Sequence, residues 1–129
     1  MSIANSSIST PQISESFSAA IRSMDVQVGD HSFIVAQINS MNAIELEEVK
    51  EKLVPYLSER FEGLGVEMCF VMLTNIVKED TELLCFGEKA KDVARSAFQL
   101  SPDMEHIVLK GLVSRKKQLI PSIVTVLQQ

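Results

Sequence analysis

The chain has 129 residues, enough for one domain with a substantial core and too few for two ordinary domains. It is 46% hydrophobic and 22% charged, with a net charge of −5, and this acidic balance argues against a general nucleic-acid-binding protein. The first residues lack the basic and apolar regions of a signal peptide, and no apolar run reaches the roughly 18 residues that cross a bilayer. We therefore expect a cytoplasmic protein with neither a nucleic acid nor a membrane as partner.

The first third of the sequence predicts a leader, a helix and a hairpin. Residues 1–9 are rich in Ser and Asn, which is typical of a disordered leader. Thr10 and Pro11 form a helix start, and apolar residues at helical spacing continue that helix to Met24. Residues 26–28 and 31–38 are then predicted to form the two arms of a hairpin, with Gly29-Asp30 as its turn. Its second arm is apolar on both faces, so we expect a central strand.

The middle of the chain predicts a long helix followed by a buried strand. Asn42, with Glu45 three residues later, is a capping arrangement, and the apolar stripe that follows continues to residue 64. Pro55 falls within this helix and should kink or split it around residues 51–55. Residues 66–73, VEMCFVML, read as an uninterrupted buried strand.

The last third predicts two strands and two helices. A polar turn at 78–80 precedes a strand at 82–86, and Gly87 precedes a short helix with one apolar face through residue 98. A strand at 105–110 and a helix at 120–127 follow, with Pro121 in the first helical turn. The alternation of strands and helices predicts an α/β fold: a single layered domain with a mixed β-sheet of about five strands flanked by helices.

None of the residues usually used in catalysis is arranged for it. His31 and His106 lie apart, without the neighbouring ligands that a metal site needs, so we predict no metal ligand in this chain. Ser114 has no base near it in the sequence. Glu45, Glu47, Glu48 and Glu51 are typical of the solvated face of a helix. Cys69 and Cys85 stand in apolar runs and are expected to be buried, reduced thiols.

The segment GLVSRKKQLIP, residues 111–121, gathers a quarter of the 12 basic residues at one strand–helix junction. Cations are unfavourable at a helix N-terminus unless an anion binds among them, because the helix dipole already places positive charge there. Arg115 can grip a phosphate with two parallel hydrogen bonds, and a lysine adds a point charge. The alternative is a solvated basic loop.

This segment and two others resemble the C-terminal DHHA2 domain of the manganese-dependent (family II) inorganic pyrophosphatases, in the DHH phosphoesterase superfamily. The others are Ala36-Gln37-Ile38-Asn39-Ser40 and Leu73-Thr74-Asn75-Ile76, and the resemblance covers about residues 13–127 in order. It implies a leader at 1–9 and a DHHA2-like substrate-binding domain at 10–129. The catalytic DHH domain is expected on a separate N-terminal unit.

The resemblance also implies the roles of the basic residues. Arg115 and Lys116 would bind substrate phosphates, Ser114 would shape the loop, and Lys117 would have a supporting role. No catalytic residue and no cofactor is expected in this chain. Manganese, or magnesium, would be held by the N-terminal domain, so we predict that this chain alone is inactive.

One position departs from the family pattern. Met24 falls where the family has a second substrate-binding lysine. Arg22 is the alternative source of that charge, but in the predicted helix it would point about half a turn away from position 24. This difference leaves short polyphosphate open as a substrate beside pyrophosphate.

Three functions remain open from the sequence. The first is the substrate-binding domain of a manganese-dependent pyrophosphatase, monomeric in isolation, with an N-terminal DHH domain as partner. The second is a stand-alone phosphate-binding or regulatory module. The third is a domain of another DHH phosphoesterase. An exopolyphosphatase-like enzyme is one alternative of that class. An oligoribonuclease-type enzyme is another, which the chain resembles less because it lacks a Gly-Gly-Gly-His segment and has few aromatic residues for stacking on bases.

Overall fold

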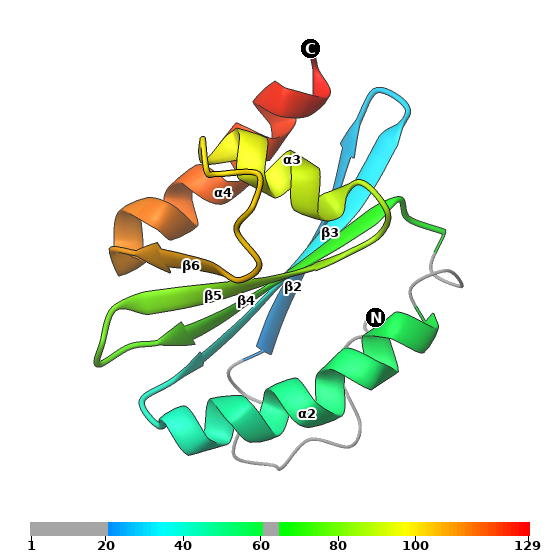
Figure 1. Cartoon of the computed structure of the whole chain (residues 1–129). Coiled ribbons are helices and arrows are strands. Elements are labelled where there is room, and N and C mark those ends of the chain that lie inside the picture. Colours follow the sequence, from blue (N-terminus) through cyan, green and yellow to red (C-terminus); the bar gives the residue numbers. More distant parts are fainter. Residues whose placement is uncertain (1–20, 61–64) are drawn as a thin grey trace.

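The computed structural model describes residues 21–60 and 65–129, and it confirms the predicted α/β fold: a five-stranded mixed sheet with helices on both faces (Figure 1). The strands are β2 (Ile21–Val28), β3 (His31–Ser40), β4 (Met68–Asn75), β5 (Asp80–Phe86) and β6 (Ile107–Lys110). The helices are α2 (Ala43–Arg60), α3 (Ala90–Ala97) and α4 (Leu112–Leu127).

The strands stand in the sheet in the order in which they occur in the chain. β3 and β4 pair in parallel, and α2 makes the crossover between them, while the other three pairs are antiparallel. β3, β4 and β6 therefore all end at the same edge, at Ser40, Asn75 and Lys110. We call this the carboxyl edge. α2 and α4 both begin there, so two helix N-termini lie at one end of the molecule.

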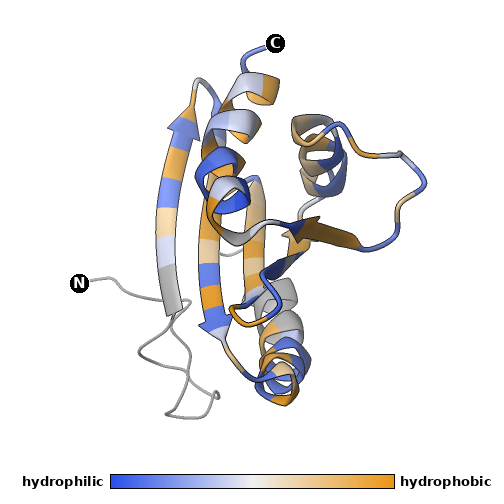
Figure 2. Cartoon of the chain, turned by 90° about the vertical axis from the view of Figure 1, so that its left-hand side faces the viewer, coloured by the Kyte–Doolittle hydropathy of each residue, from blue (hydrophilic) through white to orange (hydrophobic). Residues whose placement is uncertain are grey.

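Each face of the sheet has its own apolar core. On one face α3 and α4 pack on Phe33 and Phe70, whose rings meet edge to face at 5.8 Å, a contact that stabilises by about 0.5–1.5 kcal/mol beyond burial. On the other face α2 packs Val49 and Leu53 against β3 and β4. From Met24 to Val28 the edge strand β2 alternates apolar and polar residues, and Figure 2 shows this pattern. The second hairpin arm, β3, is buried on both faces as predicted.

The predicted helix is wrong for residues 21–24, which belong to β2. β2 pairs with β3 along its whole length, from Ile21 opposite Ile38 to Val28 opposite His31. The pairing with β3 supplies backbone hydrogen bonds along this segment and keeps it extended, which a local helical pattern cannot reveal. Residues 10–20 of that predicted helix, and the predicted leader at 1–9, lie outside the described residues.

The predicted cap of α2 is confirmed. The Asn42 side-chain oxygen accepts hydrogen bonds from the backbone N–H groups of Ile44 (2.8 Å) and Glu45 (3.3 Å). The alternative of a helix split near Pro55 is wrong, because α2 continues unbroken to Arg60. Pro55 and Glu51 are exposed, so the carbonyl that loses its helical partner can bond to water.

α4 begins at Leu112, eight residues before the predicted start, and Pro121 lies in its interior instead of its first turn. Gly111 explains the early start, because its φ of 86° turns the chain directly from β6 into the helix. Both ends of β4 and the starts of β5 and β6 differ from the expected bounds by two residues, whereas the ends of β5 and β6 agree with them. Within residues 21–60 and 65–129, no helix combines the length and apolar character needed to cross a membrane.

Candidate functional site

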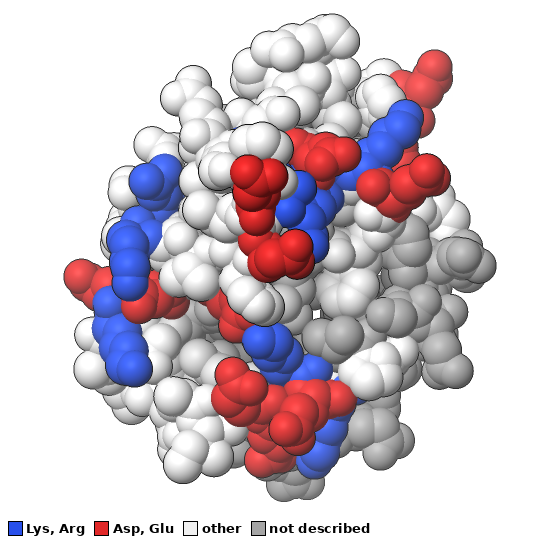
Figure 3. Space-filling view, viewed as in Figure 1, with Lys and Arg blue, Asp and Glu red and all other residues white. Residues whose placement is uncertain are grey.

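The basic segment lies at the carboxyl edge, in the first turns of α4 and not in a loop before it. Basic side chains gather where β6 passes into α4, at the left of Figure 3, with acidic side chains beside them. In open α/β sheets, ligands commonly bind beyond the carboxyl ends of the strands. The N-terminus of a helix at that edge adds partial positive charge and outward-facing N–H groups, so the arrangement suits an anion.

Gly111 fixes the junction between β6 and α4. Its backbone N–H donates to the Glu79 carbonyl oxygen (3.1 Å), which ties the junction to the β4–β5 turn. Its carbonyl accepts from the Arg115 N–H (3.2 Å), the first hydrogen bond of the helix. Ser114 and Lys117 are exposed on the opening turns. Backbone contacts therefore hold the start of α4 on both sides.

Arg115 is held towards α3. Its side-chain Nε donates to the Lys110 carbonyl oxygen (3.2 Å), and its guanidinium carbon lies 5.8 Å from the centre of the Phe98 ring. A guanidinium attracted by an aromatic face keeps its charge, because the ring contributes only its quadrupole. Arg115 thus has a defined direction while it remains a cation with several donors.

Lys116 is held towards the sheet. It precedes the fully buried Leu119 and Ile123 by three and seven residues, so it lies on the helix stripe that packs on the core. Its half-buried side chain ends at Asn39, where the ammonium donates to the amide oxygen at 2.6 Å. A lysine on the core-facing stripe is thereby brought to the carboxyl edge.

Arg22 occupies a different place from the one expected. It lies in β2 opposite Gln37, near the carboxyl edge. Positions 22 and 24 of a strand share a face, so the expected half-turn between them is wrong. Met24, which was expected to stand in place of the family's second lysine, is 54% exposed. Positions 22 and 24 of β2 therefore lie on the same face of the sheet.

Two residues of this site were not predicted from the sequence. Asn39 is a polar residue near the end of β3, beyond the apolar run of residues 33–36, and that placement was the available signal. Phe98 was predicted only as part of the apolar face of α3. It lies beyond the last helical residue and contacts Arg115. The local pattern around Phe98 does not encode this contact, because the two residues come from different elements.

The described residues do not suit manganese. The Nδ1 atom of His31 lies 2.7 and 2.8 Å from the two carboxylate oxygens of Glu67. This pair offers two ligating side chains, and a metal site needs more ligands than that. Across residues 21–60 and 65–129, no group of three or more His, Cys, Asp or Glu side chains is close enough to hold a metal ion. No metal-dependent step is therefore assigned to this chain.

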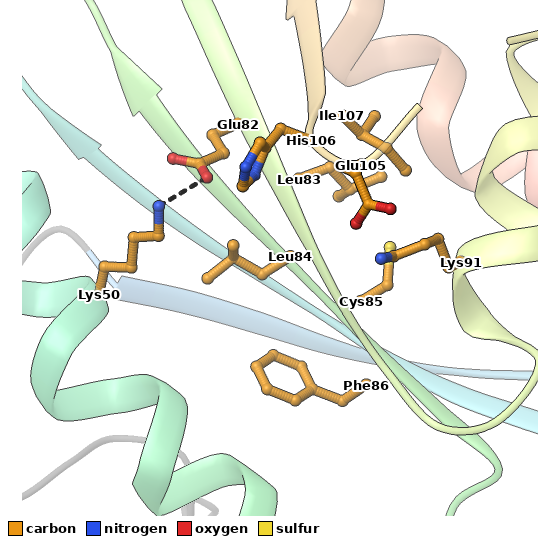
Figure 4. A pocket seen from close by; sticks show the side chains of 10 residues that line it. All are labelled: Lys50, Glu82, Leu83, Leu84, Cys85, Phe86, Lys91, Glu105, His106 and Ile107. Carbon is orange, nitrogen blue, oxygen red and sulfur yellow. Dashed lines mark hydrogen bonds and ion pairs between the residues drawn. The ribbon is translucent and has the colours of Figure 1, made fainter. Parts of the chain in front are cut away.

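A pocket of about 320 Å³ lies along β5, away from the basic segment (Figure 4). Leu84 and Phe86 form an apolar wall, and the ion pair Lys50–Glu82 (2.8 Å) closes one end. Its lining includes His106 and Cys85 but none of the predicted phosphate ligands. The pocket is therefore separate from the candidate anion site.

Both cysteines are free thiols, as expected. Cys69 packs with the core under α2, whereas Cys85 packs against the core under α3 and α4, so the sheet separates them. Burial raises the pKa of each thiol to about 12, which keeps both protonated at neutral pH.

Comparisons with known proteins show which proteins this chain is similar to. The sequence profile of the DHHA2 domain matches residues 1–126. The chain is 28% identical over 127 residues to the cobalt-dependent inorganic pyrophosphatase of Clostridium perfringens, covering 96% of this chain and 22% of that protein. It is 33% identical over 94 residues to a protein of Oceanobacillus iheyensis named as a manganese-dependent inorganic pyrophosphatase, covering 72% and 30%.

A solved structure gives the same fold. The crystal structure described as a family II inorganic pyrophosphatase of Methanococcus jannaschii superposes with a TM-score of 0.72 at 24% identity, covering 83% of this chain and 34% of that chain. At that identity the likeness shows the fold alone. The chain spans less than a third of the length of the two relatives named above. From the profile match over residues 1–126, the chain belongs to the DHHA2 domain family.

Proposed function

We propose that this domain binds pyrophosphate as the C-terminal part of a manganese-dependent inorganic pyrophosphatase. In this proposal the substrate-binding domain covers residues 10–129, and an N-terminal DHH domain carries the metal ions and the chemistry. The names of the relatives support the activity, and the match to the DHHA2 family supports the assignment of this part of the protein.

The observation that carries the proposal is the paired placement of Arg115 and Lys116 at the carboxyl edge. Each side chain is held in a fixed direction, by Phe98 and the Lys110 carbonyl or by Asn39, and each remains a hydrogen-bond donor. Preorganised cations of this kind stabilise the negative charge of bound phosphate without first having to be ordered. Ser114 shapes the turn in this proposal, and Lys117 adds charge from the exposed side.

The two cations also suit an anion with more than one phosphate group. Successive helical residues differ in direction by about 100°, so Arg115 and Lys116 diverge from one helical turn. In this proposal a phosphoanhydride offers separate phosphate oxygens to the two side chains. Arg22 is the third cation of this proposal, because its position in β2 lies on the same face of the sheet as that of Asn39, and short polyphosphate is proposed as a further ligand.

Calorimetric titration with pyrophosphate, at low salt and without manganese, tests the proposal. Arg115→Ala and Lys116→Ala should each weaken binding by about tenfold or more, because a charge-assisted hydrogen bond contributes roughly 1.5–3 kcal/mol. Lys89→Ala removes the same charge from an exposed site at the other end of the sheet and should have little effect. If all three variants bind as the unchanged chain does, the basic segment is only a solvated surface.

The remaining parts of the proposal concern the state of the protein in the cell. We propose a cytoplasmic protein whose isolated DHHA2 domain is monomeric. Sedimentation equilibrium of the chain at several concentrations tests the second point, and a mass that rises towards the dimer would contradict it.

A further inference from the structure

The side chain of Lys116 lies where α4 would otherwise bury an apolar residue. Leu119 and Ile123, on the same stripe, are completely buried against the sheet, so position 116 faces the last residues of β3 and β4. A lysine is accommodated there because its aliphatic stem packs while its ammonium extends to a polar group. In this fold the Asn39 amide oxygen, 2.6 Å away, is such a group.

Asn39 belongs to a polar row across three strands. It stands opposite Thr74 of β4, and Thr74 stands opposite Thr81 of β5. Both threonines are fully buried, and their hydroxyl groups bond to each other at 3.0 Å. The row lies on the face that packs against α4, as the alternation from Phe33 and Val35 to Asn39 requires. The apolar packing of α4 therefore gives way to polar contacts at the carboxyl edge.

We propose that Asn39 is a positioning residue, whose neutral amide oxygen directs the Lys116 ammonium towards the bound anion. The inference rests on the proposed function, since it names the group that prepares one of its two cations. A neutral acceptor fixes the direction of the ammonium without cancelling its charge. A carboxylate at the same place would form an ion pair with Lys116 and would repel an incoming phosphate.

The test compares pyrophosphate binding by Asn39→Ala, Asn39→Asp and Lys116→Met, measured by calorimetry at low salt, with a thermal melt of each variant to check folding. Asn39→Ala should weaken binding by about fivefold, because the ammonium loses one oriented hydrogen bond. Asn39→Asp should weaken it by about tenfold or more. If Asn39 had a purely structural role, Asn39→Ala would weaken binding more than Asn39→Asp, because Asp has nearly the same shape as Asn and Ala does not.

The decisive measurement is the double variant. If Asn39 acts through Lys116, then Asn39→Ala should change the affinity of the Lys116→Met protein by less than about twofold. Asn75→Asp is the matched control. It makes the same change at the same edge, on the face that packs against α2, where Asn75 accepts from the Lys78 N–H. It should change the affinity by less than about twofold, because its charge is directed away from the site.

The outcomes separate the two proposals. If Lys116→Met does not weaken binding, the proposed function loses its support and the role of Asn39 falls with it. If Lys116→Met weakens binding but Asn39→Asp binds as tightly as the unchanged chain, the positioning role is overturned and the proposed function stands. Equal losses for Asn39→Asp and Asn75→Asp would also overturn it, because only general charge would then matter.

Discussion

Arg115 and Lys116 are neighbours in the chain, but two different parts of the fold hold them. The helix turns one side chain towards Phe98 beyond α3 and the other towards Asn39 of β3. The direction of each cation therefore depends on a partner that the sequence around residue 115 does not contain. A basic segment that looks uniform in the sequence is a pair of separately oriented groups in the structure.

Phe98 should matter to binding through Arg115. Phe98→Leu keeps an apolar side chain but removes the aromatic face, a contact that contributes about 0.5–1 kcal/mol at an exposed site. We expect pyrophosphate affinity to fall about two- to fivefold in calorimetry. Phe86→Leu makes the same change in the core under α2 and should leave affinity unchanged. Equal effects of the two substitutions would mean that packing, and not the contact with Arg115, is responsible.

At the scale of single residues, the sequence could single out candidate phosphate ligands but not the contacts that hold them. Arg115 and Lys116 could be singled out because three adjacent cations at a strand–helix junction are unusual in an acidic chain. Asn39 could not be assigned its role, because its partner lies 77 positions further along the chain. Arg22 was given the wrong direction because the predicted element was wrong.

Secondary structure was predictable where local signals dominate. The Asn42 cap, the buried strands and the apolar face of α3 all follow from patterns within a few residues. β2 was missed at its start because its apolar positions also fit a helical period, and pairing with β3 decides between the two. The start of α4 was missed because glycine more often ends a helix than begins one.

The cap of α2 should contribute to the stability of the whole domain. Asn42→Ala removes the side-chain acceptor for the N–H groups of Ile44 and Glu45 and should lower the free energy of unfolding by about 1 kcal/mol. Asn42→Asp keeps an acceptor at the helix N-terminus and should be much less destabilising. Denaturant unfolding curves measure both. A loss for Asp as large as that for Ala would show that the cap oxygen is not the stabilising group.

At the scale of the whole molecule, one sheet carries two separate cores; Cys69 is buried in one of them and Cys85 is half-buried against the other. The mixed sheet of about five strands could be predicted from the alternation of elements. The position of the candidate site could be recognised only from the structure, because the parallel pairing of β3 with β4 determines at which edge of the sheet these strands end. Topology, and not composition, brings the starts of α2 and α4 to one edge.

The buried thiols should make the fold sensitive to alkali. The pKa of each thiol is about 12 in the folded chain, against 9.0 for an unperturbed thiol. Below pH 9 the thiols are therefore protonated in both the folded and the unfolded chain, and their contribution to the free energy of unfolding is constant. Between pH 9 and 12 the unfolded thiols ionise and the folded ones do not. The free energy of unfolding should therefore fall with rising pH, by about 1.4 kcal/mol per pH unit for each thiol.

Unfolding curves between pH 8 and 10 measure this slope. Cys69→Ala lowers stability at every pH by opening space in the core under α2, but it should also reduce the slope above pH 9 by about half. An unchanged slope in this variant would mean that other groups cause the alkaline loss.

The 77-residue separation between Asn39 and Lys116 has a consequence for the order of events during folding. The crossover through α2 must close before β3 and β4 can pair, and β5, β6 and α4 must then be added before the two residues meet. Closing such distant contacts is slow compared with forming local turns and helices. Anion affinity should therefore be among the last properties that a newly made chain acquires, and a bound anion should favour the completed fold over every partly folded form.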